Sequence, residues 1–211
     1  MNEPLWRPSE ERRKAANLTA FMNQAGERWG AAFGDYEALY DWSVREPEKF
    51  WLSMWDFAAI IAETQGQRVV VDGDKMPGAQ WFPDARLNYA ENLLRRRDGG
   101  DAMVFWGEEK VRRRLSFAEL HGQVSRFAQA LKARGIGEGD RVAGYLPNMP
   151  ETIVAMLAAT SLGAIWSSCS PDFGAQGVLD RFGQIAPKAL IAAEGYYYGG
   201  KQLDCLDKLR Q

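Results

Sequence analysis

A lysine that follows a glycine-rich stretch has the setting in this chain that best suits phosphate chemistry. Residues 195–202 read Gly-Tyr-Tyr-Tyr-Gly-Gly-Lys-Gln, close to the phosphate-loop pattern G-x-x-x-x-G-K-[ST]. The stretch follows a predicted strand and precedes a predicted helix, as such a loop does. Gln202 replaces the hydroxyl residue that would hold magnesium, and three tyrosines crowd the amides that would wrap a phosphate. The residues therefore argue against a nucleotide loop, although Lys201 can still contact a phosphate as a point charge.

A polar loop is the second candidate site. Residues 167–172 read Ser-Ser-Cys-Ser-Pro-Asp and follow the second of three predicted strands. Ligands of open α/β sheets bind at the carboxyl ends of the strands. The same composition also fits an ordinary connecting loop, so both interpretations stay open.

Other catalytic or metal-binding patterns are missing from the sequence. It contains no G-x-S-x-G, no H-E-x-x-H and no EF-hand loop. The glycines at 135, 137 and 139 follow a predicted helix and precede a strand, the reverse of a dinucleotide fingerprint. The single histidine, His121, has no partner that would make it a base. We therefore assign no catalytic residue and no metal ligand.

The elements that must position these residues alternate between strands and helices. Strands are predicted over 141–146, 164–168 and 189–193, and helices over 149–162 and 175–185. This alternation predicts an α/β fold with a parallel βαβαβ sheet. Because the strands lack polar alternation, we expect the sheet to be buried on both faces.

The preceding segment predicts a hairpin and a long helix. Strands are expected over 102–106 and 111–115. Ser116-Phe-Ala-Glu119 matches a capping box, and Gly135 suits the left-handed residue after a helix.

Residues 1–100 predict a mainly helical extension. Helices are expected after Ser9 (carrying Leu18, Phe21 and Met22 on one side), from Tyr36 to Pro47, over 48–61 and after Asp84, with a short strand at 69–71. The 48–61 helix carries an aromatic stripe that includes Phe50, Trp51, Met54 and Trp55. We interpret this stripe as packing against the main domain rather than as a ligand box.

Composition narrows the class of protein. The chain has 211 residues, 46% of them hydrophobic, and a formal charge of −2, which predicts a globular protein that binds neither nucleic acid nor membrane. The arginine runs at 95–97 and 112–114 have acidic neighbours and are expected to be solvated. Two isolated cysteines favour a reducing compartment, and the start lacks the apolar core of a signal peptide. We therefore expect a cytoplasmic protein.

Several of these segments together resemble the adenylate-forming acyl-CoA synthetases. Leu115-Ser-Phe-Ala-Glu-Leu120 resembles the first core motif of that superfamily, and 139–164, with Leu146-Pro-Asn-Met-Pro-Glu151, resembles the second. Residues 166–182 are similar to the acetoacetyl branch. Residues 50–57 and 87–92 resemble the N-terminal extension of short-chain members. The resemblance implies an extension over residues 1–100 and the first part of an AMP-binding (adenylation) domain over 101–211.

The resemblance also implies a ligase reaction in two halves. ATP and acetoacetate give an acyl-adenylate and pyrophosphate, with Mg²⁺ offsetting phosphate charge, and coenzyme A then displaces AMP. The family's Pro-Lys phosphate loop, adenine motif and ribose-binding aspartate do not occur in the chain. We therefore expect an N-terminal fragment that works only with the remainder of the synthetase, is inactive alone and binds no cofactor tightly. A different short-chain acid, or a non-catalytic binding module on the same scaffold, stays open.

The resemblance carries two sites over to this sequence. In the acetyl-CoA branch of the family, basic residues in the loop after the third strand contact the coenzyme A 3′-phosphate. The matching residues here are Tyr198, Gly199, Gly200 and Lys201. Tyr198 replaces one basic residue of that pattern. The loop Ser170, Pro171, Asp172 and Phe173 matches a segment along the pantetheine channel.

Overall fold

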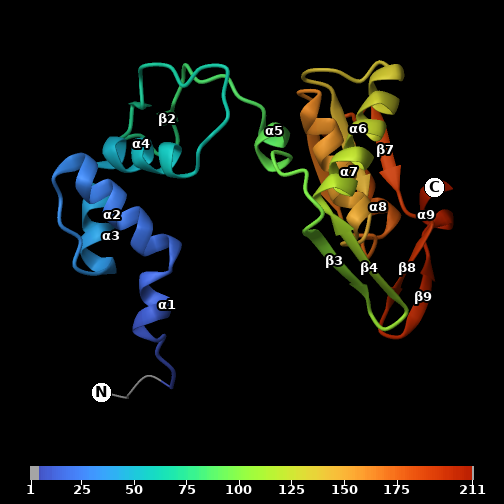
Figure 1. Ribbon diagram of the computed structural model, residues 1–211. Coiled ribbons are helices and arrows are strands. Elements are labelled where there is room, and N and C mark those ends of the chain that lie inside the picture. The colour runs from blue at the N-terminus through green and yellow to red at the C-terminus, as the bar shows by residue number, and fades with distance from the viewer. Residues whose placement is uncertain (1–4, 211) are drawn as a thin grey trace. The chain divides into compact units, whose positions relative to one another are not determined.

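The chain forms two compact units in the computed structural model, which describes residues 5–210. The division falls between Leu87 and Asn88. Figure 1 shows the elements of both units, and each unit is described on its own below.

The N-terminal unit is a small helical cluster followed by a two-stranded ribbon. Its elements are α1 (Glu10–Lys14), α2 (Asn17–Trp29), α3 (Tyr36–Arg45), α4 (Pro47–Phe57), and the antiparallel strands β1 (Val70–Val71) and β2 (Gln80–Trp81). Phe21, Ala25 and Leu39 form its buried centre. The predicted mainly helical character of this segment is confirmed.

The predicted first helix is broken in two. Ser9 caps α1 as expected, since its Oγ accepts a hydrogen bond from the Arg12 amide at 3.2 Å. Ala16 is extended, and the Thr19 hydroxyl donates to the Arg13 carbonyl at 2.6 Å across the break. Phe21 on α2 is buried, whereas Leu18, which we expected on the same side, is exposed.

The aromatic stripe of α4 divides between two neighbourhoods. Phe50 and Met54 pack on the cluster around Phe21, so this half of the stripe packs inside the N-terminal unit. Trp51 lies beside Trp81, with ring centroids 5.8 Å apart, and Trp55 beside Phe82 at 4.8 Å. Successive residues of a helix point about 100° apart, which separates the two halves. The two halves stay adjacent, since the Phe50 and Trp51 ring centroids lie 5.2 Å apart. All these contacts lie inside the N-terminal unit, whereas we expected the stripe to pack against the main domain.

The helix expected after Asp84 begins later and has a different cap. Asp84 forms an ion pair with the Arg68 guanidinium instead. Asn88 caps α5 (Tyr89–Leu93), because its Oδ1 accepts from the Glu91 amide at 3.1 Å. The Asn88 amide group also donates to the Thr160 carbonyl at 3.0 Å, which fastens α5 to the helix that ends there.

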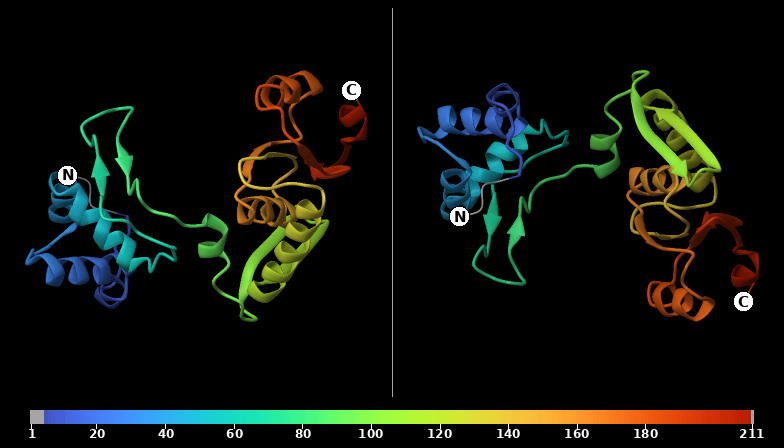
Figure 2. Two further views of the ribbon diagram at one scale, coloured as in Figure 1. Left: turned by 90° about the horizontal axis from the view of Figure 1, so that it is seen from above. Right: turned by 90° about the horizontal axis from the view of Figure 1, so that it is seen from below.

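The second unit contains the sheet and its helices. In chain order its remaining elements are β3 (Asp101–Gly107), β4 (Val111–Ser116), α6 (Phe117–Ala133), β5 (Arg141–Tyr145), α7 (Pro150–Ser161), β6 (Ile165–Cys169), α8 (Ala175–Phe182), β7 (Ala189–Ala192), β8 (Gly195–Tyr198), β9 (Lys201–Asp204) and α9 (Leu206–Arg210). β3 and β4 form the predicted antiparallel hairpin, which lies alongside α6 in both views of Figure 2.

The three predicted parallel strands pair in the order β6-β5-β7. The α/β class and the parallel βαβαβ sheet are therefore confirmed. Only the middle strand is buried along most of its length, whereas Ile165 and Leu190 on its neighbours are exposed. Because these two side chains are exposed, the expectation of burial on both faces fails for β6 and β7.

The helix ends follow the local signals. Ser116 and Glu119 form the predicted capping box, with the Ser116 amide donating to Glu119 Oε2 at 2.8 Å and the Glu119 amide to Ser116 Oγ at 3.2 Å. Gly135 has φ +77°, the left-handed conformation that glycine adopts without a Cβ clash.

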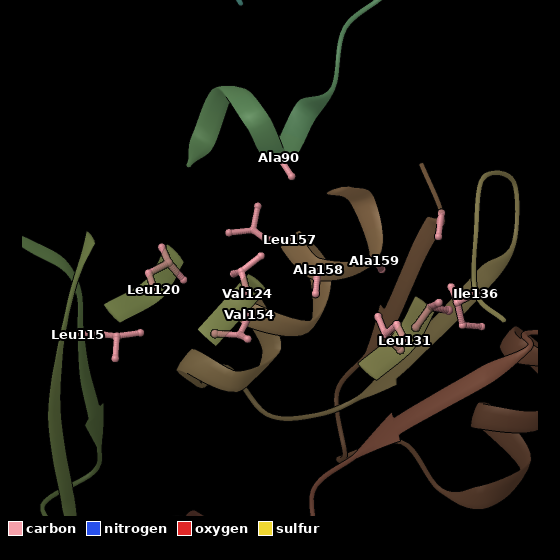
Figure 3. Close-up of a cluster of buried hydrophobic side chains, with 12 residues drawn as sticks. Ala90, Leu115, Leu120, Val124, Leu131, Ile136, Val154, Leu157, Ala158 and Ala159 are labelled. Carbon is pink, nitrogen blue, oxygen red and sulfur yellow. The ribbon is translucent and has the colours of Figure 1, made fainter. Parts of the chain in front are cut away.

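The main core lies where α6 and α7 meet. Figure 3 shows Leu120 and Val124 of α6 near Val154 and Leu157 of α7. Ala90 of α5 lies beyond Leu157 in the same view. A second buried cluster, on the opposite face of the sheet, contains Tyr145, Cys169 and Cys205. Both cysteines are free thiols.

Candidate functional site

A cavity of about 630 Å³ lies in the second unit, at the carboxyl edge of the sheet. The β3–β4 hairpin, the start of α7, the loop after β6 and the β8–β9 hairpin all contribute to its wall. Residues of differing chemistry face it, including Phe105, Arg113, Asn148, Asp172, Glu194 and Tyr198. The strands end together here because Tyr145 of β5 is in register with both Cys169 of β6 and Ala192 of β7.

The glycine-rich stretch is a tight hairpin and not a loop before a helix. Tyr198 of β8 stands opposite Lys201 of β9, and Gly199 and Gly200 turn the chain with φ of +59° and +75°. Two consecutive positive φ values characterise a hairpin turn that matches the twist of its strands. The helix predicted directly after this stretch begins only at Leu206. The prediction that Lys201 lies between a strand and a helix, as in a phosphate loop, is therefore wrong.

The two hairpins that flank the cavity are joined at their tips. The Gly200 amide donates to Glu108 Oε2 at 2.9 Å, and Figure 1 shows both tips on the same side of the unit. Glu108 itself has φ +52° in the turn of the first hairpin. The amide of Gly200 is therefore already engaged by a carboxylate.

The loop after β6 is held by side chains from three elements. The buried hydroxyl of Tyr145 lies 2.8 Å from the Pro171 carbonyl and 2.7 Å from the Phe173 carbonyl. Lys208 of α9 donates to the Pro171 carbonyl at 2.8 Å, and the Tyr196 hydroxyl of β8 donates to Asp172 Oδ1. The loop is thus fixed in place as one wall of the cavity.

Asp172 is stabilised as a carboxylate. Its Oδ2 accepts from the Ser170 hydroxyl at 2.8 Å. The hydrogen bonds from Tyr196 and Ser170, together with the positive charge of Lys208, lower the pKa of Asp172. Burial and the same carboxylate raise the pKa of Tyr196, so this phenol stays protonated and remains a donor. Burial also raises the pKa of Tyr145, which does not serve as a base.

The structure gathers some of the predicted site residues and separates others. Ser170, Pro171, Asp172 and Tyr198 face the cavity. Among the described residues that line it, Phe173, Gly199, Gly200 and Lys201 do not appear. The Arg181 guanidinium lies 3.9 Å from the centre of the Phe173 ring. Lys201 is exposed at the tip of the second hairpin.

Sequence reasoning missed several residues that shape the cavity. Tyr196 and Lys208 are 24 and 37 residues beyond their partners in the loop. The one available signal was strand periodicity, since a tyrosine in a strand two residues before Tyr198 must share its face.

Metal and membrane features are not found in the described part of the chain. Between residues 5 and 210, no three His, Cys, Asp or Glu side chains are grouped so that they could hold a metal ion. None of the helices described there has the length and apolar character needed to cross a membrane.

Comparison with known proteins settles the family. Residues 91–210 match the model of the AMP-binding enzyme family. The chain belongs to this family. As an AMP-binding family member it also matches, over residues 36–93, the model of the acetyl-coenzyme A synthetase N-terminus. The resemblance to adenylate-forming acyl-CoA synthetases is confirmed.

Several relatives of this AMP-binding enzyme chain are named acetoacetyl-CoA synthetase. Acetoacetyl-coenzyme A synthetase of Rhizobium meliloti (strain 1021) is 56% identical over 98% of this chain and 32% of its own length. Acetoacetyl-CoA synthetase of Rattus norvegicus is 42% identical over 98% of this chain and 31% of its own length. The structure of acetoacetyl-CoA synthetase from Streptomyces lividans matches with a TM-score of 0.92 at 44% identity, over 99% of this chain and 33% of that one. The chain therefore spans about a third of the length of the relatives it matches.

Proposed function

We propose that this chain is part of an AMP-forming acetoacetate–CoA ligase. The observation that supports this proposal most directly is the match of 98% of the chain, at 56% identity, to a protein named acetoacetyl-coenzyme A synthetase. In the proposed reaction ATP activates acetoacetate to an acyl-adenylate and releases pyrophosphate. The thiol of coenzyme A then displaces AMP and gives acetoacetyl-CoA. Magnesium would offset the phosphate charge of ATP.

The described residues suit the thiol half of this reaction better than the ATP half. The phosphate loop, adenine motif and ribose-binding aspartate that the family resemblance implies for the ATP half do not occur in this sequence. The cavity at the carboxyl edge of the sheet has a size typical of sites for small ligands and cofactors. We therefore assign no adenylation step to this chain and expect ATP and magnesium to be held by the remainder of the synthetase.

The proposal divides the chain by role. Residues 1–100 serve as the extension typical of short-chain acyl-CoA synthetases, and residues 101–211 form the first part of the adenylation domain. The substrates of the complete protein are acetoacetate, ATP and coenzyme A, and this chain works together with the remainder of the synthetase. We expect no nucleic acid partner. The free thiols of Cys169 and Cys205 fit a reducing cytoplasm, where we place the enzyme.

Two segments are proposed to meet coenzyme A. The loop Ser170, Pro171, Asp172 and Phe173 borders the path of the pantetheine arm, and Tyr198, Gly199, Gly200 and Lys201 meet its 3′-phosphate. Lys201 supports this assignment because it is a cation exposed beside the cavity wall. Since Glu108 already accepts from the Gly200 amide, the phosphate contact depends on the Lys201 ammonium rather than on that amide.

The phosphate contact is tested in the complete protein with Lys201→Ala. Losing one exposed ion pair should raise KM for coenzyme A by about two- to fivefold. The exchange of pyrophosphate into ATP, which reports adenylate formation alone, should stay within error. Lys132→Ala, which removes another exposed lysine at the end of α6, is the matched control. Equal losses in both half-reactions would contradict the assigned role.

The acid substrate is tested by competition. A relative named malonamoyl-CoA synthetase vrtB, from Penicillium aethiopicum, is 35% identical over 99% of this chain and 30% of its own length, so the name of the acid differs among relatives. The complete protein should form a coenzyme A thioester from acetoacetate with higher kcat/KM than from malonamate, acetate or butyrate. Preference for another acid would correct the substrate. Failure to activate any acid would overturn the ligase proposal and favour a non-catalytic binding module.

A further inference from the structure

The loop after β6 is fixed by a link to a hairpin far along the chain. The Tyr196 hydroxyl donates to Asp172 Oδ1, and the Ser170 hydroxyl donates to Oδ2 at 2.8 Å. The Asp172 amide in turn donates to Ser170 Oγ at 3.3 Å. Both carboxylate oxygens are therefore engaged by protein hydroxyl groups, so Asp172 acts within the wall rather than toward a ligand.

The link connects two walls of the same cavity. Ser170, Pro171 and Asp172 lie on one side, and Glu194 to Tyr198 lie on the other. The Tyr196 ring packs against the buried cluster that contains Tyr145, which holds the ring while its hydroxyl reaches the loop. The Asp172 side chain is exposed, so without this bond it would be held by the Ser170 hydroxyl of its own loop and not by the hairpin. The Tyr196–Asp172 hydrogen bond thus joins the side chains of these two walls directly.

The other contacts fix only the backbone of the loop. Tyr145 and Lys208 bind the carbonyl of Pro171, on the buried side. They anchor the base of the loop through backbone carbonyls, and these hydrogen bonds do not reach the Asp172 carboxylate. Tyr196 is consequently the residue that sets where the carboxylate lies relative to the hairpin.

We propose that Tyr196 is a positioning residue that acts through Asp172 to set the width of the cavity for the thiol substrate. The inference rests on the proposed ligase function, in which the arm of coenzyme A occupies this cavity. Tyr196 supports thioester formation and has no part in activating the acid. Losing it should therefore weaken the second half-reaction alone.

The test uses the complete protein with Tyr196→Phe, which removes the hydroxyl and keeps the ring in the buried cluster. Losing a hydrogen bond to a carboxylate should raise KM for coenzyme A by about three- to tenfold. The rate of pyrophosphate exchange and KM for the acid should stay within about twofold of the parent, because the adenylation step is untouched. Tyr89→Phe removes an exposed hydroxyl of the same unit and should change none of these values.

A second variant tests the partner. Asp172→Asn keeps the shape and an acceptor oxygen but removes the charge, so its effect on KM should be smaller than that of Tyr196→Phe. Because both changes act on the same hydrogen bond, the double variant should be no worse than the more severe single variant. Amide hydrogen exchange at residues 170–174 should accelerate in Tyr196→Phe, which reports loosening of the loop without any assay of activity.

The outcomes separate this inference from the ligase proposal. An unchanged KM for coenzyme A in a Tyr196→Phe protein that still makes thioester would overturn the inference and leave the function intact. Equal losses in both half-reactions would show that Tyr196 is merely structural and would also overturn it. Absence of any acid activation by the parent protein would overturn both.

Discussion

Gly144 on the central strand gives the sharpest test of how the sheet is packed. A Cβ placed on Gly144 would lie 2.4 Å from Cζ2 and 2.6 Å from Cη2 of Trp166 on the neighbouring strand. No Cβ tolerates such distances, so the indole must move in Gly144→Ala. The ring is half-buried and packs against the main core, which limits where it can go.

The expected cost follows from the size of this clash. Forcing one extra methyl group into a packed interior costs about 1–3 kcal/mol. For a chain of this length each kcal/mol lowers the melting temperature by roughly 2–4 °C. Thermal unfolding followed by circular dichroism should therefore show a clear decrease in melting temperature, and the tryptophan fluorescence of the native state should change as the indole moves.

Two further variants decide whether the clash is the cause. Gly137→Ala is the control, because a Cβ there meets nothing within 4 Å. Trp166→Phe removes the atoms that clash, so Gly144→Ala should cost less in the Trp166→Phe background than in the parent. If Gly144→Ala is as stable as Gly137→Ala, or if its cost is the same in both backgrounds, the packing argument is refuted.

Two other predictions concern the start of the second unit. Asn88→Ala should lower stability by about 1–3 kcal/mol, because the α5 cap and the bond to the Thr160 carbonyl are both lost, whereas Asn88→Asp should restore the cap alone. Equal melting temperatures for the two variants would contradict this. The Arg96 guanidinium and the Gly100 amide lower the pKa of Asp98 to about 2. The Arg96–Asp98 pair should stabilise the fold above about pH 4, and this contribution should fade as pH falls toward about 2. An NMR titration of Asp98 in Arg96→Ala should give a pKa closer to the ordinary value near 3.9. An unchanged pKa of Asp98 would exclude Arg96 as the cause.

Local signals predicted the elements whose ends are determined by neighbouring residues. The capping box at Ser116 and the left-handed Gly135 needed only residues within a few positions, and both are present. The parallel sheet followed from the alternation of apolar segments. Such features depend on backbone geometry and periodicity, which a sequence displays directly.

Distant partners explain the errors. Asp84 and Asn88 are both good capping residues, and Arg68, 16 residues before Asp84, decides which of them caps a helix. In the same way, Gly199 and Gly200 suit a phosphate loop and a hairpin turn equally well on local grounds. The pairing of Tyr198 with Lys201 chooses the hairpin.

The candidate site was only half accessible to sequence reasoning. Its loop lies where a topological rule places ligands, so Ser170 to Asp172 could be predicted. Tyr196 and Lys208 could not, because their bonds to the loop join segments 24 and 37 residues apart. Strand periodicity places Tyr196 on the same face as Tyr198, but it does not pair Tyr196 with Asp172 or Lys208 with Pro171.

The burial of both cysteines has a practical consequence for experiments on this protein. Cys205 is fully buried and Cys169 is 9% exposed, and burial raises the pKa of both thiols. A folded chain should therefore react slowly with disulfide reagents, since the thiolate is the reactive form. A colorimetric reagent for free thiols can follow the consumption of coenzyme A with little background from the protein. The same reagent also reports the opening of α9, because Cys205 becomes reactive only when the segment around it leaves the core.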